Sequence, residues 1–474
     1  MPFNSLTFIL FFATILVLYH SLRNWKVQKS ILLVGSYLFY AAWNPPFVLL
    51  LWLSTVIDWF AAKGIEKSEN KGSKRGYLLL SLATNLGLLA FFKYGGFVLD
   101  NFKNALGLIG LELQFAAPDI ILPVGISFYT FQTLSYTLDV YNGKSRSAES
   151  FLDYALYVTF FPQLVAGPIV RSNHFLPQCQ NARVTTAHTF GWGLFLLTLG
   201  LFQKVVLADG LLAPAADAVF GWRQGPVGTL DAWTGIFAFS GQIFFDFSGY
   251  STCAIGVAMC LGFMLPDNFR SPYAAIGFSD FWRRWHISLS TWIRDYIYIP
   301  LGGSRQGKAR ALTNLFFTMF LVGLWHGAAW HFVLWGILHG FYLVIEHLLR
   351  KKYGESERFQ RKSWRFALWV ITLSIVCLTW IFFRSDSPLY TFLLLLASLG
   401  VIPNGAQILP TTQILTVFCI FIPLLITHWK LRDTRLENVY EQAPGWLIAL
   451  FWTLMLFGII ITQGTGNAFI YFQF

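Results

Sequence analysis

The sequence predicts an all-α fold, a polytopic transmembrane helical bundle, and three observations lead to this class. Hydrophobic residues make up 55% of the 474 residues and charged residues only 12%, so the chain has too few charges to cover a water-soluble surface. Aromatic residues make up 18%, as expected of a protein that packs rings against lipid and anchors them at both interfaces. Apolar stretches recur along the whole chain. We expect about ten to twelve spans in a single domain that covers residues 1–474.

The spans are expected where apolar residues run for roughly 17 to 25 positions. These segments are 5–22, 30–43, 46–62, 77–95, 120–138, 151–168, 189–208, 228–265, 311–328, 331–349, 366–384, 388–402, 411–428 and 445–462. The stretch 228–265 is long enough for two spans, whereas the short stretches 30–43 and 388–402 could be tilted or re-entrant. No small-residue cleavage site follows the first stretch, which we therefore expect to be a retained span.

The net charge of +11 comes from 34 basic and 23 acidic residues. The basic residues gather in loops near 23–29, 63–75, 350–365 and 430–435, which the positive-inside rule places in the cytoplasm. Both termini then lie outside, provided that the segment 388–402 does not cross. Because the basic residues form no continuous patch, the charge predicts topology and no nucleic-acid partner. The five cysteines form no CxxC pair, which argues against a zinc site or a disulfide framework.

The segment from Phe281 to Gly303, FWRRWHISLSTWIRDYIYIPLGG, is too polar to span a bilayer and too aromatic for a solvated loop. At helical spacing, its large apolar residues gather on one side, and the other side carries Arg283, His286, Ser290 and Arg294. This pattern predicts an amphipathic helix in the plane of the membrane interface. Such a helix could be a simple anchor, but its arginines also suit an anionic ligand such as a phosphate.

The segment GLWHGAAWHFVLWGILHG places His326 inside apolar sequence. An ionisable group at membrane depth is a candidate for function, although a histidine can also simply bond across a helix interface. On a continuous helix His331 would lie about 140° and His339 about 220° around the axis from His326, so neither has the spacing of a helical metal pair. We therefore expect no metal and interpret His326 as a general base, since an apolar pocket favours the neutral imidazole.

Three further segments, 122–141, 160–171 and 241–251, carry polar residues together with Gly, Pro or Ser. Such interruptions are tolerated in a bilayer where they are buried in protein or line a cavity. The candidates for lining a cavity are Gln132, Tyr136, Gln163, Arg171, Asp246, Ser248 and Tyr250. Hydrogen bonding between helices explains any one of them equally well, but a carboxylate such as Asp246 requires a partner. The chain has no GxSxG, GxxxxGK[ST] or HExxH motif, which argues against a serine hydrolase or an ATP-driven pump.

The strings FPQLVAGPIVR, FFDFSGYS, FWRRWHISLSTWIRDYIYIPLGG and GLWHGAAW occur in this order. With them the chain resembles the membrane-bound O-acyltransferases, in particular the alginate O-acetylase branch that includes D-alanyl lipoteichoic acid transfer proteins. The resemblance implies a helical bundle with a central tunnel, in which a cytoplasmic thioester donor meets an acceptor from the other side. It also implies catalytic roles for His326 and His286. Our own interpretation adds donor binding by Arg283, Arg284, Arg294 and Ser290.

The function expected from this resemblance is transfer of acetyl from acetyl-CoA toward an exported polysaccharide, with alginate the best candidate. The expected location is the bacterial cytoplasmic (inner) membrane, with a periplasmic acetyltransferase or polysaccharide-export proteins as partners and no tightly bound cofactor. D-alanyl transfer to teichoic acid and O-acetylation of peptidoglycan or cellulose are alternatives. A transporter is the non-enzymatic alternative, because Asp246 and the broken helices would serve it as well.

Overall fold

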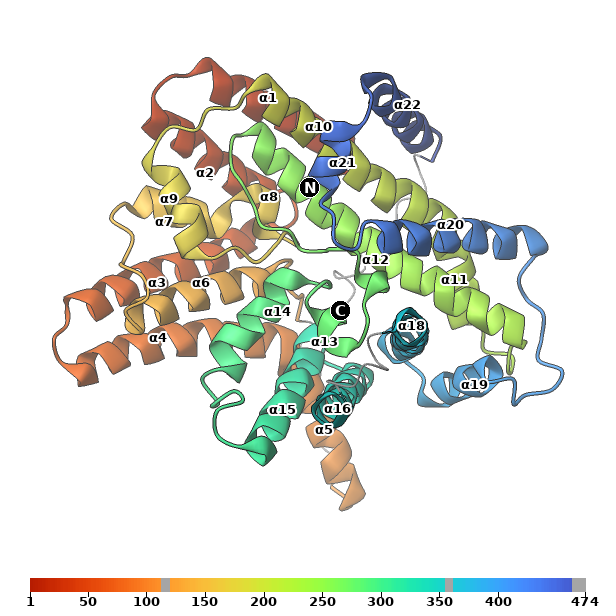
Figure 1. Ribbon diagram of the computed structural model, residues 1–474. Helices are drawn as coiled ribbons and strands as arrows, with labels where there is room; N and C mark the ends of the chain where they lie inside the picture. The colour runs from red at the N-terminus through yellow and green to blue at the C-terminus, as the bar shows by residue number, and fades with distance from the viewer. Residues whose placement is uncertain (112–119, 354–360, 463–474) are drawn as a thin grey trace. The chain divides into compact units, whose positions relative to one another are not determined.

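The computed structural model describes residues 1–111, 120–353 and 361–462, and in these ranges the chain consists of helices, turns and one isolated bridge (Figure 1). The predicted all-α class is confirmed. Arg358, in the third basic cluster, lies outside the described residues.

Seven described helices are long and apolar enough to cross a membrane, which confirms a polytopic membrane protein. They are Pro45–Lys67, Lys71–Leu108, Ala187–Gly221, Thr229–Cys260, Trp330–Tyr353, Lys362–Arg384 and Thr411–Lys430. Three shorter apolar helices are Leu6–Ser21, Pro388–Ser398 and Gly445–Ile461.

The stretches 228–265 and 151–168 are divided differently from the expectation. The stretch 228–265 forms one helix, α12 (Thr229–Cys260, 32 residues), where two spans were expected. Its glycines do not interrupt it because neighbouring elements pack against them: a Cβ at Gly249 would lie 2.7 Å from the carbonyl oxygen of Gly200. The stretch 151–168 is broken into α7 (Phe151–Thr159) and the four-residue α8 (Phe161–Leu164). Pro162 explains the break, since its ring cannot continue a helix from the preceding turn.

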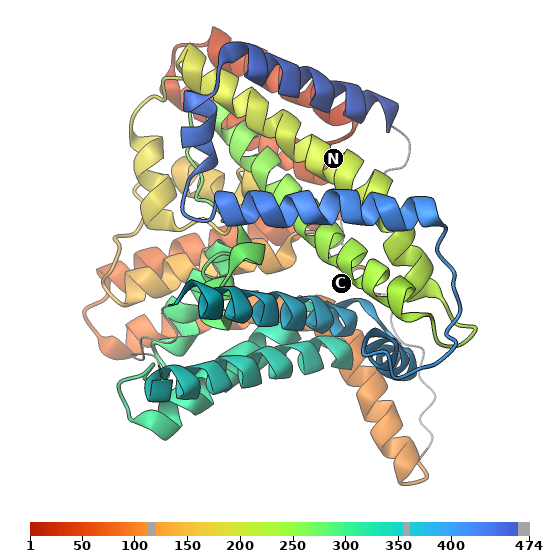
Figure 2. The ribbon, with the colours of Figure 1, turned by 45° about the vertical axis from the view of Figure 1, so that its right-hand side comes forward.

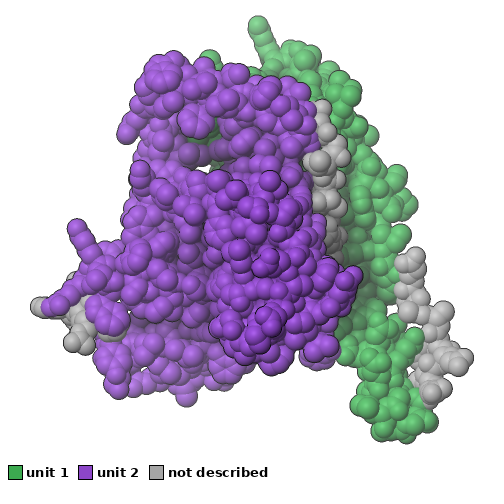
Figure 3. All heavy atoms as spheres, turned by 90° about the vertical axis from the view of Figure 1, so that its right-hand side faces the viewer, with its two compact units in different colours: residues 1–197, 253–266 green, residues 198–252, 267–474 purple. Residues whose placement is uncertain are grey.

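The chain divides into two compact units, shown in green and purple in Figure 3. Unit 1 contains residues 1–197 and 253–266, and unit 2 contains residues 198–252 and 267–474.

In unit 1, three helices pack against one another: α3 (Val48–Lys67), α4 (Lys71–Leu89) and α6 (Ile126–Tyr141) (Figure 1). A buried amide joins them. The Asn85 side chain donates to both carboxylate oxygens of Asp58, at 3.1 and 2.8 Å, and its oxygen accepts from hydroxyls of α3 and α6. Polar bonds of this kind hold helices together where water cannot compete.

In unit 2, α15 (Lys308–His326) and α16 (Trp330–Tyr353) form a tightly packed pair, and α18 (Lys362–Arg384) packs against α16 (Figure 2). The two helices approach closely at a glycine. A Cβ at Gly323 would lie 2.4 Å from the carbonyl oxygen of Phe332, so a side chain there would push α16 away. This close approach fixes the end of α15, where His326 is the last residue.

Candidate active site

His326 is a buried histidine at the end of a helix, with 4% of its surface exposed. Three aromatic rings surround its imidazole. Their centroids lie 4.9 Å away for Trp325, 5.0 Å for Trp335 and 5.2 Å for Phe383, all in edge-on geometry. The rings come from α15, α16 and α18, so the packing of these three helices sets the position of the imidazole.

The prediction that residues 281–303 form one continuous helix is wrong. The chain forms α13 (Phe278–Trp282), α14 (Ile287–Ile293) and a π-helical turn, η5 (Arg294–Tyr298). Between α13 and α14, His286 has a left-handed backbone with φ of 45°, which ends the helical periodicity. Most of the large apolar residues on the predicted apolar side are buried in the protein, as Trp285 with 1% exposure illustrates, and so they do not form a lipid-facing stripe.

His286 is fully buried and not part of an exposed polar stripe. Its Nδ1 lies 3.2 Å from the side-chain oxygen of Asn268, and the Phe247 ring packs edge-on against the imidazole at 4.6 Å. The Trp325 ring, which contacts His326, also faces His286 at 6.1 Å. Burial lowers the pKa of His286 from 6.5 to about 3, because it disfavours the imidazolium.

The other two histidines near His326 belong to α16, and the helix is interrupted between them and His326 at residues 327–329. The expected angles of a continuous helix therefore do not apply. His331 bonds through Nδ1 to the Phe382 carbonyl oxygen at 3.1 Å, and His339 bonds through Nε2 to the Thr379 hydroxyl at 3.1 Å. Both contacts join α16 to the region of α18. Among the described residues no three His, Cys, Asp or Glu side chains form a group that could hold a metal ion.

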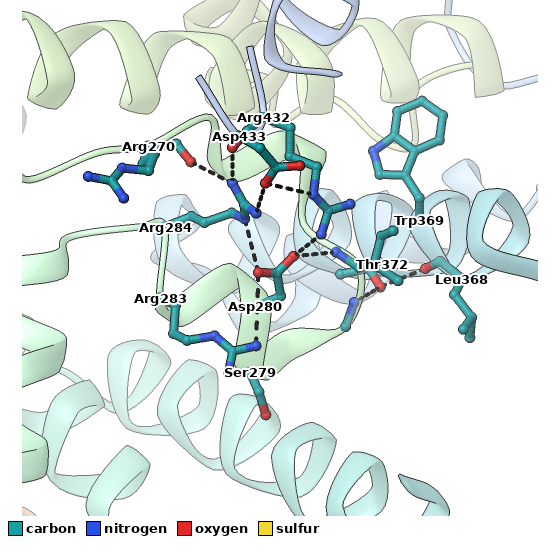
Figure 4. Close-up of polar contacts among 12 residues, drawn as sticks. Arg270, Ser279, Asp280, Arg283, Arg284, Leu368, Trp369, Thr372, Arg432 and Asp433 are labelled. Atoms are coloured by element: carbon teal, nitrogen blue, oxygen red, sulfur yellow. Dashed lines mark hydrogen bonds and ion pairs between the residues drawn. The ribbon is translucent and has the colours of Figure 1, made fainter. Parts of the chain in front are cut away.

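The four residues expected to bind the donor differ in solvent exposure and in the contacts that they already make. Arg284 is only 11% exposed and is held by Asp280 at 3.0 Å and by the Arg432 carbonyl oxygen at 2.6 Å (Figure 4). Asp280 also accepts from the Arg432 guanidinium at 2.6 Å. These contacts tie α13 to the chain that follows α20 (Thr411–Lys430), which is a structural role for Arg284.

Arg283 and Arg294 are the donor-binding candidates whose guanidinium groups remain accessible, with side-chain exposures of 66% and 59%. Arg283 is 3.9 Å from Asp280, and Arg294 pairs with its neighbour Asp295 at 2.8 Å. The Ser290 hydroxyl donates to the Trp285 carbonyl oxygen at 3.2 Å.

Four of the residues expected to line a cavity belong to unit 1: Gln132, Tyr136, Gln163 and Arg171. Tyr136 accepts from the Ala148 backbone N–H at 2.9 Å, and Gln163 donates to the Tyr157 carbonyl oxygen at 2.8 Å. The side-chain oxygens of Gln132 and Gln163 are buried without a hydrogen-bond partner in the described part of the chain. These two oxygens therefore keep both glutamines as candidates for contact with a polar ligand.

Asp246, Ser248 and Tyr250 belong to unit 2, where Asp246 has the partner that its burial requires. Lys204 forms ion pairs with Asp246 and with Asp209, the latter at 2.9 Å. Lys204 is not among the residues predicted from the sequence. It lies on a π-helix, η3 (Phe202–Leu212), whose hydrogen bonds join residues five apart, and this winding brings Lys204 and Asp209 to the same side. The Ser248 hydroxyl lies 3.4 Å from the side-chain oxygen of Gln203, the residue that precedes Lys204.

The fold and the site define a polytopic membrane protein with two buried histidines, His286 and His326, held by elements of one unit. The profile of the membrane-bound O-acyltransferase family matches residues 144–391, a range that contains both His286 and His326. The chain belongs to this family, and it is an O-acyltransferase.

Individual relatives are also named as acyltransferases. The chain is 40% identical over 389 residues to a "Probable alginate O-acetylase" of Pseudomonas syringae, covering 82% of this chain and 73% of the relative. It is 37% identical over 393 residues to a "Peptidoglycan O-acetyltransferase" of Helicobacter pylori, with coverages of 77% and 72%. A "Teichoic acid D-alanyltransferase" of Streptococcus thermophilus is 30% identical over 284 residues, with coverages of 55% and 68%.

Proposed function

We propose that the chain transfers an acetyl group from cytoplasmic acetyl-CoA toward an exported polysaccharide, with alginate the leading acceptor and the bacterial inner membrane the location. The observation that carries this proposal is the placement of His326, buried among three aromatic rings at the end of α15, in a chain whose relatives include O-acetylases.

The chemistry requires one proton acceptor. The acceptor hydroxyl oxygen forms a bond to the acetyl carbonyl carbon, the carbon–sulfur bond breaks, and coenzyme A leaves as its thiol. His326 takes the hydroxyl proton as the oxygen attacks and returns it to the leaving sulfur, so that the histidine ends as it began. A positioned base of this kind contributes a factor of about 10² to 10⁴ to the rate.

The donor assignment rests on exposed arginines. Arg283 and Arg294 present guanidinium groups to solvent, and a planar guanidinium suits the phosphates of coenzyme A. Arg284 contributes indirectly, by holding α13 in place. A periplasmic acetyltransferase or polysaccharide-export proteins would receive the acetyl group where this chain does not itself reach the polymer.

D-alanyl transfer to teichoic acid is the second candidate, because a D-alanyltransferase is among the relatives. Acetyl transfer is favoured because the relative named as an alginate O-acetylase has higher identity over more of the chain.

The test uses an alginate-producing bacterium that lacks its own O-acetylase. Expression of the full chain should restore ester-linked acetate on the polymer, measured by NMR of purified alginate, and radiolabel from acetyl-CoA should enter the polymer in membranes from these cells. Absence of polymer acetate at normal protein abundance, together with D-alanine esters on teichoic acid when the chain is expressed in a D-alanylation-deficient strain, would overturn the acetyl assignment.

A further inference from the structure

Asn268 is a buried asparagine around which the His286 turn is built. Its backbone carbonyl oxygen accepts from the Ile287 N–H at 2.9 Å. Its side-chain oxygen accepts from Ser288 twice, from the backbone N–H at 3.2 Å and from the hydroxyl at 2.8 Å. Its side-chain nitrogen donates to the hydroxyl oxygen of Ser251, a residue of α12, at 3.0 Å. The amide thus joins α12 to the turn that carries His286.

These bonds fix which end of the amide faces the imidazole. A backbone N–H can only donate, so the group that faces Ser288 must be the Asn268 oxygen and not the NH₂. The same oxygen lies 3.2 Å from Nδ1 of His286. An oxygen that has no hydrogen can only accept, so Nδ1 must carry the proton. In the neutral ring the lone pair then lies on Nε2.

We propose that Asn268 is a positioning residue that holds His286 with its proton on Nδ1, so that His286 meets the substrate through an unprotonated Nε2. This inference rests on the proposed function and deepens it. It assigns His286 to a hydroxyl of the acceptor other than the one that His326 deprotonates, because Nε2 can accept the hydrogen of that hydroxyl. It does not assign His286 to the phosphates of the donor, which would require an N–H donor at Nε2.

The orientation of the His286 imidazole is also fixed by packing. The Phe247 edge packs against it at 4.6 Å, with the two planes at 89°. Rotation of the imidazole by half a turn would place the carbon Cδ2 against the Asn268 oxygen and would lose the bond from Nδ1. The orientation and the tautomer are therefore set by the same contact, as in other catalytic histidines that bond an acceptor through the second nitrogen.

The first experiment compares Asn268→Ala and Asn268→Asp with a matched control, Asn314→Ala. Asn314 is also a buried asparagine, and its side chain donates to the carbonyl oxygens of Leu301 and Gly303 at 3.0 and 3.2 Å, so its loss tests destabilisation alone. Asn268→Ala should lower kcat by about 10²-fold or more and leave the donor KM within roughly threefold, because it removes the orientation of His286, which contacts the acceptor, and leaves the donor contacts in place. Asn268→Asp keeps an acceptor oxygen for Nδ1 and for Ser288, and should recover activity to within about tenfold of the wild type. Equal kcat values for Asn268→Ala and Asn314→Ala would overturn the proposal.

The second experiment separates the two nitrogens of His286. The amide of His286→Asn can donate near the position of Nδ1 but provides no acceptor at the position of Nε2, whereas the longer His286→Gln can place its oxygen near Nε2. The proposal expects His286→Gln to transfer more acetyl than His286→Asn at equal abundance. The reverse order would contradict it.

The third measurement does not depend on acyl transfer. NMR spectra of protein labelled with ¹⁵N-histidine identify the His286 signal as the one that disappears in His286→Asn. This signal should show a protonated Nδ1. A signal with the proton on Nε2 overturns the inference even where acetyl transfer is observed. Conversely, a protonated Nδ1 in a wild-type protein that transfers no acetyl would overturn the proposed function and leave the tautomer assignment intact.

Discussion

Replacing His326 by alanine removes an imidazole that three helices hold in place. Its ring centroid lies within 5.2 Å of the rings of Trp325, Trp335 and Phe383, and 4% of the residue is exposed. The substitution therefore has two effects that must be separated. It removes the proposed base, and it leaves a cavity in the protein interior.

The two effects differ in size. Loss of a general base lowers the rate by about 10² to 10⁴-fold. A large-to-small change at a buried site costs about 2–5 kcal/mol of folding free energy, which lowers abundance but does not change the turnover of the molecules that remain folded. His326→Ala should therefore abolish measurable acetylation per molecule of folded protein.

His339→Ala is the matched control. His339 is fully buried and packs against the same Trp335, at 4.6 Å, and it also bonds to Thr379. It should lose about as much stability as His326→Ala, because both histidines are buried and both pack against Trp335. Acetylation is measured per unit of folded protein, quantified by size-exclusion chromatography in detergent. We expect His339→Ala to retain activity within about tenfold of the wild type. Near-normal acetylation by His326→Ala would refute the catalytic assignment and leave His286 as the candidate.

Three further outcomes are expected. Lys204→Met should destabilise the protein by about 3–5 kcal/mol, because it leaves two buried carboxylates without their cation. Lys67→Met, at an exposed position, is the control. Equal unfolding temperatures for Lys204→Met and Lys67→Met would contradict the structural role of Lys204. Arg294→Ala should raise the apparent donor KM without a change in unfolding temperature, whereas Arg284→Ala should lower that temperature; an unchanged donor KM for Arg294→Ala would indicate lipid contact instead. Because the pKa of His286 falls from 6.5 to about 3 on folding, the unfolded chain binds this proton first as pH falls, and folding stability is lost between these values. This proton contributes about 1.4 kcal/mol per pH unit to the slope, so detergent unfolding curves recorded from pH 7 to 4 should show a slope that is smaller by about this amount in His286→Asn.

The sequence was sufficient for the helical class and for selecting His326, because both follow from polarity. An apolar chain in a bilayer must be helical or a closed barrel, and an ionisable residue within such sequence is conspicuous without any knowledge of its neighbours. Asp246 was selected for the same reason. The catalytic and donor-binding roles stay predictions, since the structure gives positions and not reactivity.

The surroundings of these residues could not be predicted, because they depend on departures from the regular α-helix. Lys204 and Asp209 are five residues apart and would diverge on an α-helix, yet the π-helix brings them together. The helical spacing expected over residues 281–303 does not hold because His286 has a left-handed backbone. Asn268 lies outside the helices, so no periodic sequence pattern indicates its role. For Lys204 one signal was available. A buried Asp246 requires a cation, and Lys204 lies in the preceding apolar segment, 189–208.

Both proposed catalytic histidines lie where a helix is interrupted: His326 ends α15, and His286 directly precedes α14. An interruption in a buried position leaves backbone N–H groups that need acceptors. At His286 the acceptors come from Asn268, which bonds the N–H groups of Ile287 and Ser288 as well as the imidazole. The group that satisfies the broken helix is therefore also the group that orients the ring. For this reason a substitution at Asn268 that keeps the acceptor oxygen should preserve both the turn and the catalysis, and one that removes it should lose both together.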